Sequence, residues 1–401
     1  MALFRKYRQK RRRRIARKSY RRRGAGLRSF RGSRAYPFVL LGGTAAGLVA
    51  AVLLVVFLLV PALSGQPESD PDAIVPGEFV DPETGTEADI KENDLSSLQN
   101  EAVIQYKTIN DAYLCGEEIV FSSASVRDGV AFYDKLVVYN TATQESQEIS
   151  GINVKYDNIV WTRLTPDFLV WVDSNDDGGG RIMLYNRAEG KSYLVKEYAY
   201  ALPQISVSGE YLAFWQQAGE STDRFYLYHM PTREGVAVKV YDGMASVTGS
   251  AHVSEGGLVY AVPYMENEIQ KCRIYVQPLD GGAEVAYEPG RYAYSPKMNG
   301  NYIAFLSSTS GPPRDIYLME KGGETKLIES GVLNFDMGQD FLAYTKDQNV
   351  YIYVFATGQK YRLNTDISRG RLASVCGDMV AWYDVTSESD VDVVKYAKAV
   401  W

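Results

Sequence analysis

The chain has 401 residues, with 43 Lys+Arg against 49 Asp+Glu, and 46% of its residues are hydrophobic. This length allows one large domain or two to three ordinary ones. Only two His and three Cys are present, and no two Cys are close enough for a CxxC motif, which argues against a zinc site and against most His-dependent catalysis.

The first 36 residues form a strongly basic tail. They contain 16 Lys+Arg and no acid, whereas residues 37–401 sum to a charge of −22. The runs Arg11–Arg14 and Arg21–Arg23 suit either nucleic acid or anionic lipid. Each basic residue beside an anionic membrane surface contributes about 1 kcal/mol, so lipid alone accounts for the tail. We therefore expect it to contact anionic inner-leaflet lipid and not nucleic acid.

Residues 37–63 are predicted to be a single transmembrane helix. Phe38–Leu63 is a run of 26 residues without a charge, and about 20 apolar residues suffice to cross a bilayer. The positive-inside rule then places the N-terminus in the cytoplasm and everything after residue 63 outside. This is a signal anchor in the cell membrane, with a single pass.

Two features of this segment leave alternatives open. Ala62-Leu63-Ser64 resembles a signal-peptide cleavage site, although the apolar run exceeds the usual 7–15 residues of a signal peptide. Gly43 and Gly47 form a GxxxG pattern, which fits either helix dimerisation or the general abundance of Gly in membrane helices.

Residues 64–100 are predicted to be a disordered acidic linker. They contain 10 acids, four Pro, one Lys and a single aromatic residue, Phe79. So little apolar surface cannot offset the entropy lost on ordering.

From about residue 101 the sequence repeats. A turn residue, usually Gly, is followed by a short apolar run that ends in an aromatic side chain. The seven terminal aromatics are Phe121, Trp171, Phe214, Tyr260, Phe305, Tyr344 and Trp382, which are spaced 38 to 50 residues apart. A period near 44 residues is typical of a propeller blade or another repeated unit.

Each repeat contains four short runs of strand character, so residues 101–401 are predicted to be an all-β domain. Four-stranded units of this period close into a β-propeller. Seven blades are favoured, and six or eight are compatible. A β-sandwich is the alternative fold, but it does not explain the period.

One strand lies outside the repeats and predicts how the ring closes. The last repeat ends too early for a fourth strand, while Glu101–Lys107 is an alternating strand before the first repeat. We expect this strand to complete the final blade.

The repeats resemble those of the TolB-like propellers, with PD40-type repeats related to WD repeats. The matching segments are Thr165-Pro166-Asp167, Ile274-Tyr275-Val276, Gly281-Gly282, Ile316-Tyr317-Leu318 and Gly322-Gly323. TolB-type propellers often have six blades, so a count of seven departs from that type. The resemblance implies the fold and says little about function, because one fold hosts many functions.

No nucleophile motif is convincing. His252-Val253-Ser254-Glu255-Gly256 lacks the first Gly of GxSxG and has no strand-turn-helix context. Enzymes related to this family carry catalysis on a separate hydrolase domain after the propeller, and this sequence ends at Trp401. His229 and His252 are interpreted as ordinary strand or turn residues.

Calcium is the one cofactor that the sequence suggests. Asp173, Asn175 and Asp177 offer oxygen ligands at alternate positions before Gly178, as in a calcium loop. Leu184 stands where that loop needs Glu, so an acidic hairpin tip is the simpler interpretation.

Cys115 and Cys376 occupy the same place in the first and last repeats. Ring closure makes these repeats neighbours, so either a disulfide or two free thiols is compatible with the sequence. Equivalent positions on adjacent blades are usually too far apart for a disulfide, which favours free thiols.

The sequence therefore predicts a non-enzymatic binding or scaffold module for a protein, peptide or glycan. The alternative is a carbohydrate-active enzyme, a glycosidase or lyase, that uses paired carboxylates in the propeller funnel. Partner contacts are expected on the loops between second and third strands or on the opposite loop face. The former loops are 122–134, 173–180, 216–223, 264–271 and 307–314.

Overall fold

The computed structural model describes residues 98–175, 178–199, 201–217, 222–242, 251–308, 314–364, 368–386 and 391–399. These residues form 27 strands and no helix. Among them, accordingly, no helix is long and apolar enough to cross a bilayer. The predicted basic tail, membrane helix and linker up to residue 97 lie outside the described residues.

The strands group into seven blades. Blade 1 contains β2 (Asn110–Cys115), β3 (Glu118–Arg127), β4 (Val130–Asn140) and β5 (Glu145–Glu148). Blade 2 contains β6 (Ile159–Leu164), β7 (Phe168–Ser174), β8 (Gly180–Asn186) and β9 (Lys191–Tyr198). Blade 3 contains β10 (Ile205–Ser208), β11 (Tyr211–Gln217), β12 (Thr222–His229) and β13 (Glu234–Asp242). Blade 4 contains β14 (His252–Ser254), β15 (Gly257–Glu266), β16 (Ile269–Gln277) and β17 (Val285–Tyr287). Blade 5 contains β18 (Tyr294–Met298), β19 (Tyr302–Ser307), β20 (Arg314–Glu320) and the first half of β21 (Thr325–Met337). Blade 6 contains the second half of β21, β22 (Phe341–Lys346), β23 (Asn349–Val354) and β24 (Lys360–Arg362). Blade 7 contains β25 (Gly370–Cys376), β26 (Met379–Asp384), β27 (Asp392–Ala399) and β1 (Leu98–Tyr106).

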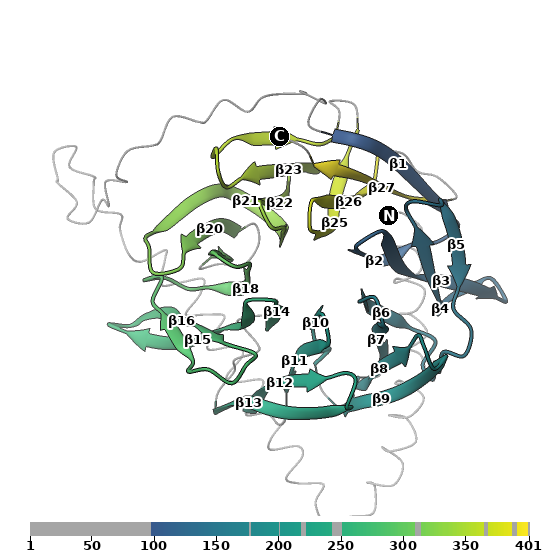
Figure 1. Cartoon of the computed structure of the whole chain (residues 1–401), viewed down its shortest axis with the longest axis horizontal. Helices are drawn as coiled ribbons and strands as arrows, with labels where there is room; N and C mark the ends of the chain where they lie inside the picture. The colour runs from purple at the N-terminus through teal and green to yellow at the C-terminus, as the bar shows by residue number, and fades with distance from the viewer. Residues whose placement is uncertain are drawn as a thin grey trace, which may run out of the picture. The chain divides into compact units, whose positions relative to one another are not determined.

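The blades are arranged radially around a central axis, with the first strand of each blade innermost (Figure 1). This confirms the predicted β-propeller of seven four-stranded blades. One detail differs from seven separate sheets. β21 is continuous across blades 5 and 6, pairing with β20 through Thr325–Glu329 and with β22 through Val332–Met337, so these two blades share one seven-stranded sheet.

The repeated aromatic residue of the sequence pattern forms the core of the ring. All seven of these side chains lie on second strands and are at most 2% exposed. They pack in hydrophobic clusters, most of which draw residues from two neighbouring blades. One period of the sequence therefore corresponds to one blade, and each period supplies one buried aromatic side chain to the contacts within and between blades.

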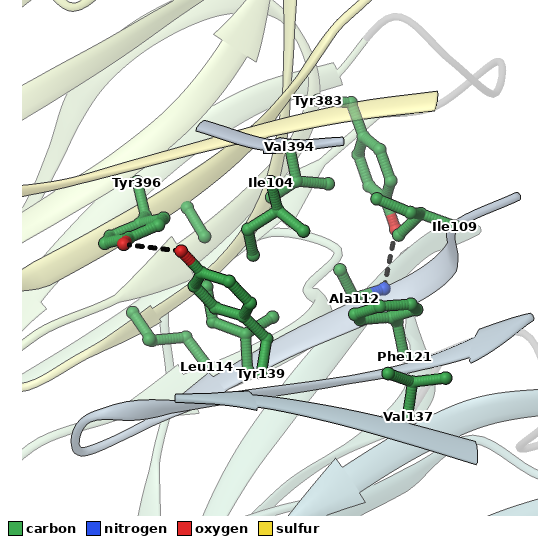
Figure 2. Packing of buried hydrophobic residues seen from close by; sticks show 12 residues of the cluster. Ile104, Ile109, Ala112, Leu114, Phe121, Val137, Tyr139, Tyr383, Val394 and Tyr396 are labelled. Carbon is green, nitrogen blue, oxygen red and sulfur yellow. Dashed lines mark hydrogen bonds between the residues drawn. The ribbon is translucent and has the colours of Figure 1, made fainter. Parts of the chain in front are cut away.

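β1 closes the ring, as predicted from the strand outside the repeats. It pairs antiparallel with β27, with Ile104 opposite Val394, and it begins at Leu98, three residues before the predicted strand. Ile104 is 2% exposed and packs between the last and first blades. Figure 2 shows this cluster, where Tyr139 and Tyr396 hydrogen-bond through their hydroxyl groups at 3.2 Å.

Candidate functional site: the central cavity and the hairpin face

A cavity of about 940 Å³ runs along the ring axis. Its walls are the seven innermost strands, β2, β6, β10, β14, β18, β21 and β25, together with the turns that follow them. Each blade thus contributes its inner strand to a common space, and blades 2 to 7 also contribute the turn that follows. In propellers such an axial space is a natural position for a ligand, because it is concave and its walls are rigid.

β-Bulges set the direction of several side chains on the inner strands. Pairing with the second strand shifts register in blades 1, 2, 5, 6 and 7. In three of these bulges a residue other than Gly has positive φ: Asp111 at 51°, Trp161 at 53° and Ser295 at 47°. A bulge inserts a residue and turns its neighbours, which is a common device beside binding sites.

An ion pair between blades 5 and 6 lies in the cavity wall. Lys297 Nζ is 2.7 Å from Asp336 Oδ1, and the Val375 N–H of blade 7 donates to Asp336 Oδ2 at 2.8 Å. Burial alone raises the pKa of Asp336, but the Lys297 ammonium and the Val375 N–H outweigh it and hold that pKa below its usual value. Asp336 is therefore an ionised carboxylate that links three blades.

His252 is a neutral ring beside this ion pair. Burial lowers its pKa to about 3, the charges of Lys297 and Arg163 lower it further, and Asp336 opposes them. Its Nδ1 is inaccessible to solvent and has no hydrogen-bond partner among the described residues. The cavity wall therefore contains a buried ring nitrogen without a hydrogen bond in the described part of the chain, which is uncommon in folded proteins.

Arg163 and two aromatic rings form the wall on the side of blades 1 and 2. The guanidinium lies over the Tyr113 ring at 4.9 Å and the Trp161 ring at 5.6 Å, and it donates to the carbonyl of Ile205 at 3.1 Å. The indole N–H of Trp161 is buried without a partner in the described part of the chain. Stacked aromatic and guanidinium planes with a spare donor suit a planar or polar ligand.

The cavity lining contains equal numbers of basic and acidic side chains among the described residues. Arg163, Lys297 and Arg314 face Glu255, Asp336 and Asp340 among the described lining residues. Charge therefore selects neither an anion nor a cation. Specificity in this space would come from the unpaired polar atoms and the aromatic faces.

Exposed apolar side chains gather at one end of the ring, which we call the hairpin face. Consecutive strands are antiparallel, so the loops between second and third strands and the connections between blades share this end. Its exposed large apolar side chains are Val126, Leu202, Met265, Ile269, Leu333, Val385 and Val391. The other four that the described residues contain, Val103, Leu194, Val285 and Leu327, lie on outermost strands.

Met265 and Ile269 are the most exposed members of this set, at 64% and 60%. They flank the two-residue turn Asn267-Glu268 at the tip of the β15–β16 hairpin. Apolar side chains projecting from rigid hairpins are more typical of a contact surface than of a solvated loop.

The predicted calcium ligands are placed only in part. Asp173 is fully buried, and its carboxylate pairs with Arg181 and accepts from the N–H groups of Lys155 and Tyr156 at 2.7 and 3.0 Å. Asn175 is at the tip of the β7–β8 hairpin, and Asp177 lies outside the described residues. No group of three or more His, Cys, Asp or Glu in the described ranges is arranged to hold a metal ion. Calcium binding stays a prediction.

Sequence reasoning missed most of the cavity wall. Lys297, Asp336 and Arg163 were not singled out, and His252 was treated as an ordinary strand residue. Their only common signal is that each lies on an inner strand, at or shortly before the turn that begins the repeated motif. Which of these alternating positions faces the axis depends on the bulges, which have no sequence signature here.

No protein-family model matches the chain, and no curated protein matches it significantly in sequence. Several solved structures are nevertheless similar to it in fold. The β-propeller domain of the Trilobed protease from Pyrococcus furiosus superposes with a TM-score of 0.54 at 13% identity, over 73% of this chain and 93% of that one. An acylaminoacyl peptidase from Pyrococcus horikoshii gives 0.53 at 12% identity, over 72% of this chain and 51% of that one, so this chain spans about half of the peptidase.

TolB from Acinetobacter baumannii is also similar, with a TM-score of 0.40 at 10% identity, over 71% of this chain and 66% of that one. That similarity is too distant to carry an argument. At such identities the comparisons show the β-propeller fold alone. The Pyrococcus furiosus propeller is described as having an open velcro topology, whereas β1 closes the ring here.

Proposed function

We propose that this protein is a membrane-tethered extracytoplasmic β-propeller that binds a protein, peptide or glycan and catalyses no reaction. The observation that carries the proposal is the hairpin face, where seven exposed apolar side chains lie on strand ends and loops at one end of a rigid ring. Loops held by a rigid scaffold are common recognition surfaces. The central cavity, whose lining includes Arg163, Lys297 and Asp336, offers a second contact for a side chain or sugar of the same partner.

The tether follows from the sequence. The uncharged run 38–63 preceded by 16 basic residues supports a signal anchor with the N-terminus in the cytoplasm. The propeller, which has an excess of acids, then lies outside. Its hairpin face can then contact a partner that lies within the length of the acidic linker.

The alternative function, a glycosidase or lyase with paired carboxylates, receives less support from the cavity. Such an enzyme needs one carboxylic acid that is protonated and a second carboxylate nearby. Asp336 is held ionised by Lys297, while Glu255 and Asp340 are exposed. The lowered pKa of Asp336 is the opposite of what a general acid requires.

The experiment compares two pairs of substitutions in the full chain. The double variant Met265→Glu/Ile269→Glu changes the hairpin face, and Val285→Glu/Leu327→Glu changes two exposed positions on outermost strands. In one set of proteins, a photoreactive residue is placed at position 194, and its cross-links report folding. In a second set it is placed at position 126, and the cross-links that it forms on intact cells report the partner. We expect discrete adducts at position 126 in the wild type and in the control pair, and their loss in the hairpin-face pair. Equal adducts in all three proteins, or sugar-chain cleavage by the purified wild type, would overturn the proposal.

A further inference from the structure

The seam between blades 1 and 7 is closed on its outer side by β1. On its inner side, β2 of blade 1 lies directly beside β25 of blade 7. The N–H of Leu114 donates to Ser374 Oγ at 2.7 Å, and the N–H of Ala112 donates to Tyr383 Oη at 2.6 Å. Figure 2 shows the second of these bonds. These bonds hold β2 against both β25 and β26 of blade 7.

Cys115 and Cys376 end these two strands at matching positions. Each is the last residue of its strand, and each is followed by a Gly with φ of +58° that begins the turn. The two thiols hydrogen-bond to each other, and the Gly116 N–H donates to Cys376 Sγ at 3.3 Å. Both cysteines are free thiols in the structure, as the sequence analysis favoured. They interact because β2 and β25 are adjacent inner strands.

Both cysteines border the central cavity, from which a reagent can approach them. The two side chains are half-buried and line the central cavity. The third cysteine, Cys272, is completely buried in the core between blades 4 and 5. It provides a matched control that is neither paired nor accessible.

We propose that Cys115 and Cys376 form a reversible disulfide that covalently closes the propeller ring between its first and last blades. The bond requires Cα atoms about 5.5 Å apart, and two thiols that already share a hydrogen bond need only a short approach. The outside compartment predicted for this domain supports such bonds.

The surroundings assign different roles to the two sulfurs. The hydrogen bond from the Cys115 thiol and the Gly116 N–H lower the pKa of Cys376 to about 6, against burial and the charges of Asp336 and Asp378. The same hydrogen bond and burial raise the pKa of Cys115. Because the Gly116 N–H donates to Cys376 Sγ and stabilises its thiolate, which is the reactive form, we assign Cys376 as the nucleophile and Cys115 as the resolving thiol.

The oxidant is a low-molecular-weight disulfide, RSSR. The Cys376 thiolate attacks one sulfur of RSSR, forming a mixed disulfide and releasing RS⁻. That anion takes the proton of Cys115, whose sulfur then attacks Cys376 Sγ and releases the second RS⁻, which is protonated. The two protein thiols lose two electrons and two protons in total, and RSSR becomes two RSH.

The disulfide would strengthen the seam and stabilise the folded protein. Without the bond, the seam depends on the β1–β27 hydrogen bonds, on the hydrogen bonds from Leu114 and Ala112 to blade 7, and on the apolar cluster around Ile104. The disulfide would close a loop that includes every blade from 1 to 7. A cross-link over so long a loop removes much of the entropy of the unfolded chain, so oxidation should raise the melting temperature.

The test uses the full chain in detergent micelles, equilibrated with mixtures of reduced and oxidised glutathione. Peptide mass mapping without reduction should find the 115–376 link, with the loss of two hydrogens. Its formation should raise the melting temperature by several degrees. Cys272→Ser should behave as the wild type in both measurements. Cys115→Ser should accumulate the glutathione adduct on Cys376 and show no rise.

Three results would overturn the proposal. They are the absence of the 115–376 peptide at every glutathione ratio, a link that involves Cys272, and a 115–376 link that leaves the melting temperature unchanged. The first two are read from the wild-type protein, so a variant that fails to fold does not affect them. A faster adduct on Cys115 than on Cys376 in the single variants would contradict the assigned roles.

Discussion

At the scale of single residues, His252 makes the free energy of unfolding depend on pH. Its pKa in the folded protein is about 3, against 6.5 for an ordinary His. Between these values the unfolded chain binds a proton that the folded protein does not, so the free energy of unfolding falls as the pH is lowered from 6.5 toward 3. The slope is at most about 1.4 kcal/mol per pH unit, and water in the cavity makes it smaller.

Replacing His252 by Gln should remove this part of the pH dependence. Urea unfolding at several pH values between 4 and 7 measures it. His229 provides the control, because its ring is near the surface, where Nε2 is 3.2 Å from Glu210, and His229→Gln should leave the slope as in the wild type. A wild-type slope that persists in His252→Gln would show that other groups carry the pH dependence.

At the scale of strands, β1 presents two adjacent residues in opposite environments. Ile104 is 2% exposed inside the seam, and Val103 is 43% exposed on the other face of the same strand. Ile104→Ala should lower the free energy of unfolding by about 2–4 kcal/mol, because it removes buried methyl groups and leaves a cavity. Val103→Ala should change it by less than about 0.5 kcal/mol. Similar effects in the two variants, measured by urea denaturation, would mean that β1 does not contribute its inner face to the core.

Hairpin turns are a second feature at this scale. β22 and β23 are joined by Asp347-Gln348, both with positive φ, in the geometry that Asp128-Gly129 adopts between β3 and β4. Gln348→Gly should stabilise the protein by about 0.5–1 kcal/mol, because Gly adopts positive φ without a steric penalty. The reverse change, Gly129→Gln, meets no atom within 4 Å and should destabilise by a similar amount. Equal midpoints of urea unfolding for the wild type and the two variants would contradict this account of the turns.

At the scale of the whole molecule, the ring is complete within residues 98–399. We expect a fragment of residues 98–401 to unfold in one cooperative transition. A fragment of residues 108–401 lacks β1, leaves the edge of β27 unpaired and opens the cluster around Ile104. It should unfold at a lower denaturant concentration and bind a dye that reports exposed apolar surface. Matching transitions for the two fragments would show that closure by β1 is dispensable.

Much of this architecture could be predicted because it depends on local patterns that repeat. The aromatic residue that ends each apolar run marks a buried second strand, so its period reports the blades directly. The strand around Ile104 could be assigned to the last blade because one repeat was short of a strand and another segment had no repeat. The continuity of β21 across two blades could not be predicted, since its residues follow the same alternation as two separate strands.

The sequence by itself determined the strand content, the blade number, the closing strand and a predicted membrane segment, because these follow from hydrophobic patterning along the chain. Only the tertiary structure decided which residues meet at the axis. Lys297 and Asp336 are 39 positions apart in the chain, and the two Cys thiols come from its first and last blades. Such pairings arise from ring closure and from bulges such as that at Trp161, which turn side chains by amounts that no local pattern encodes.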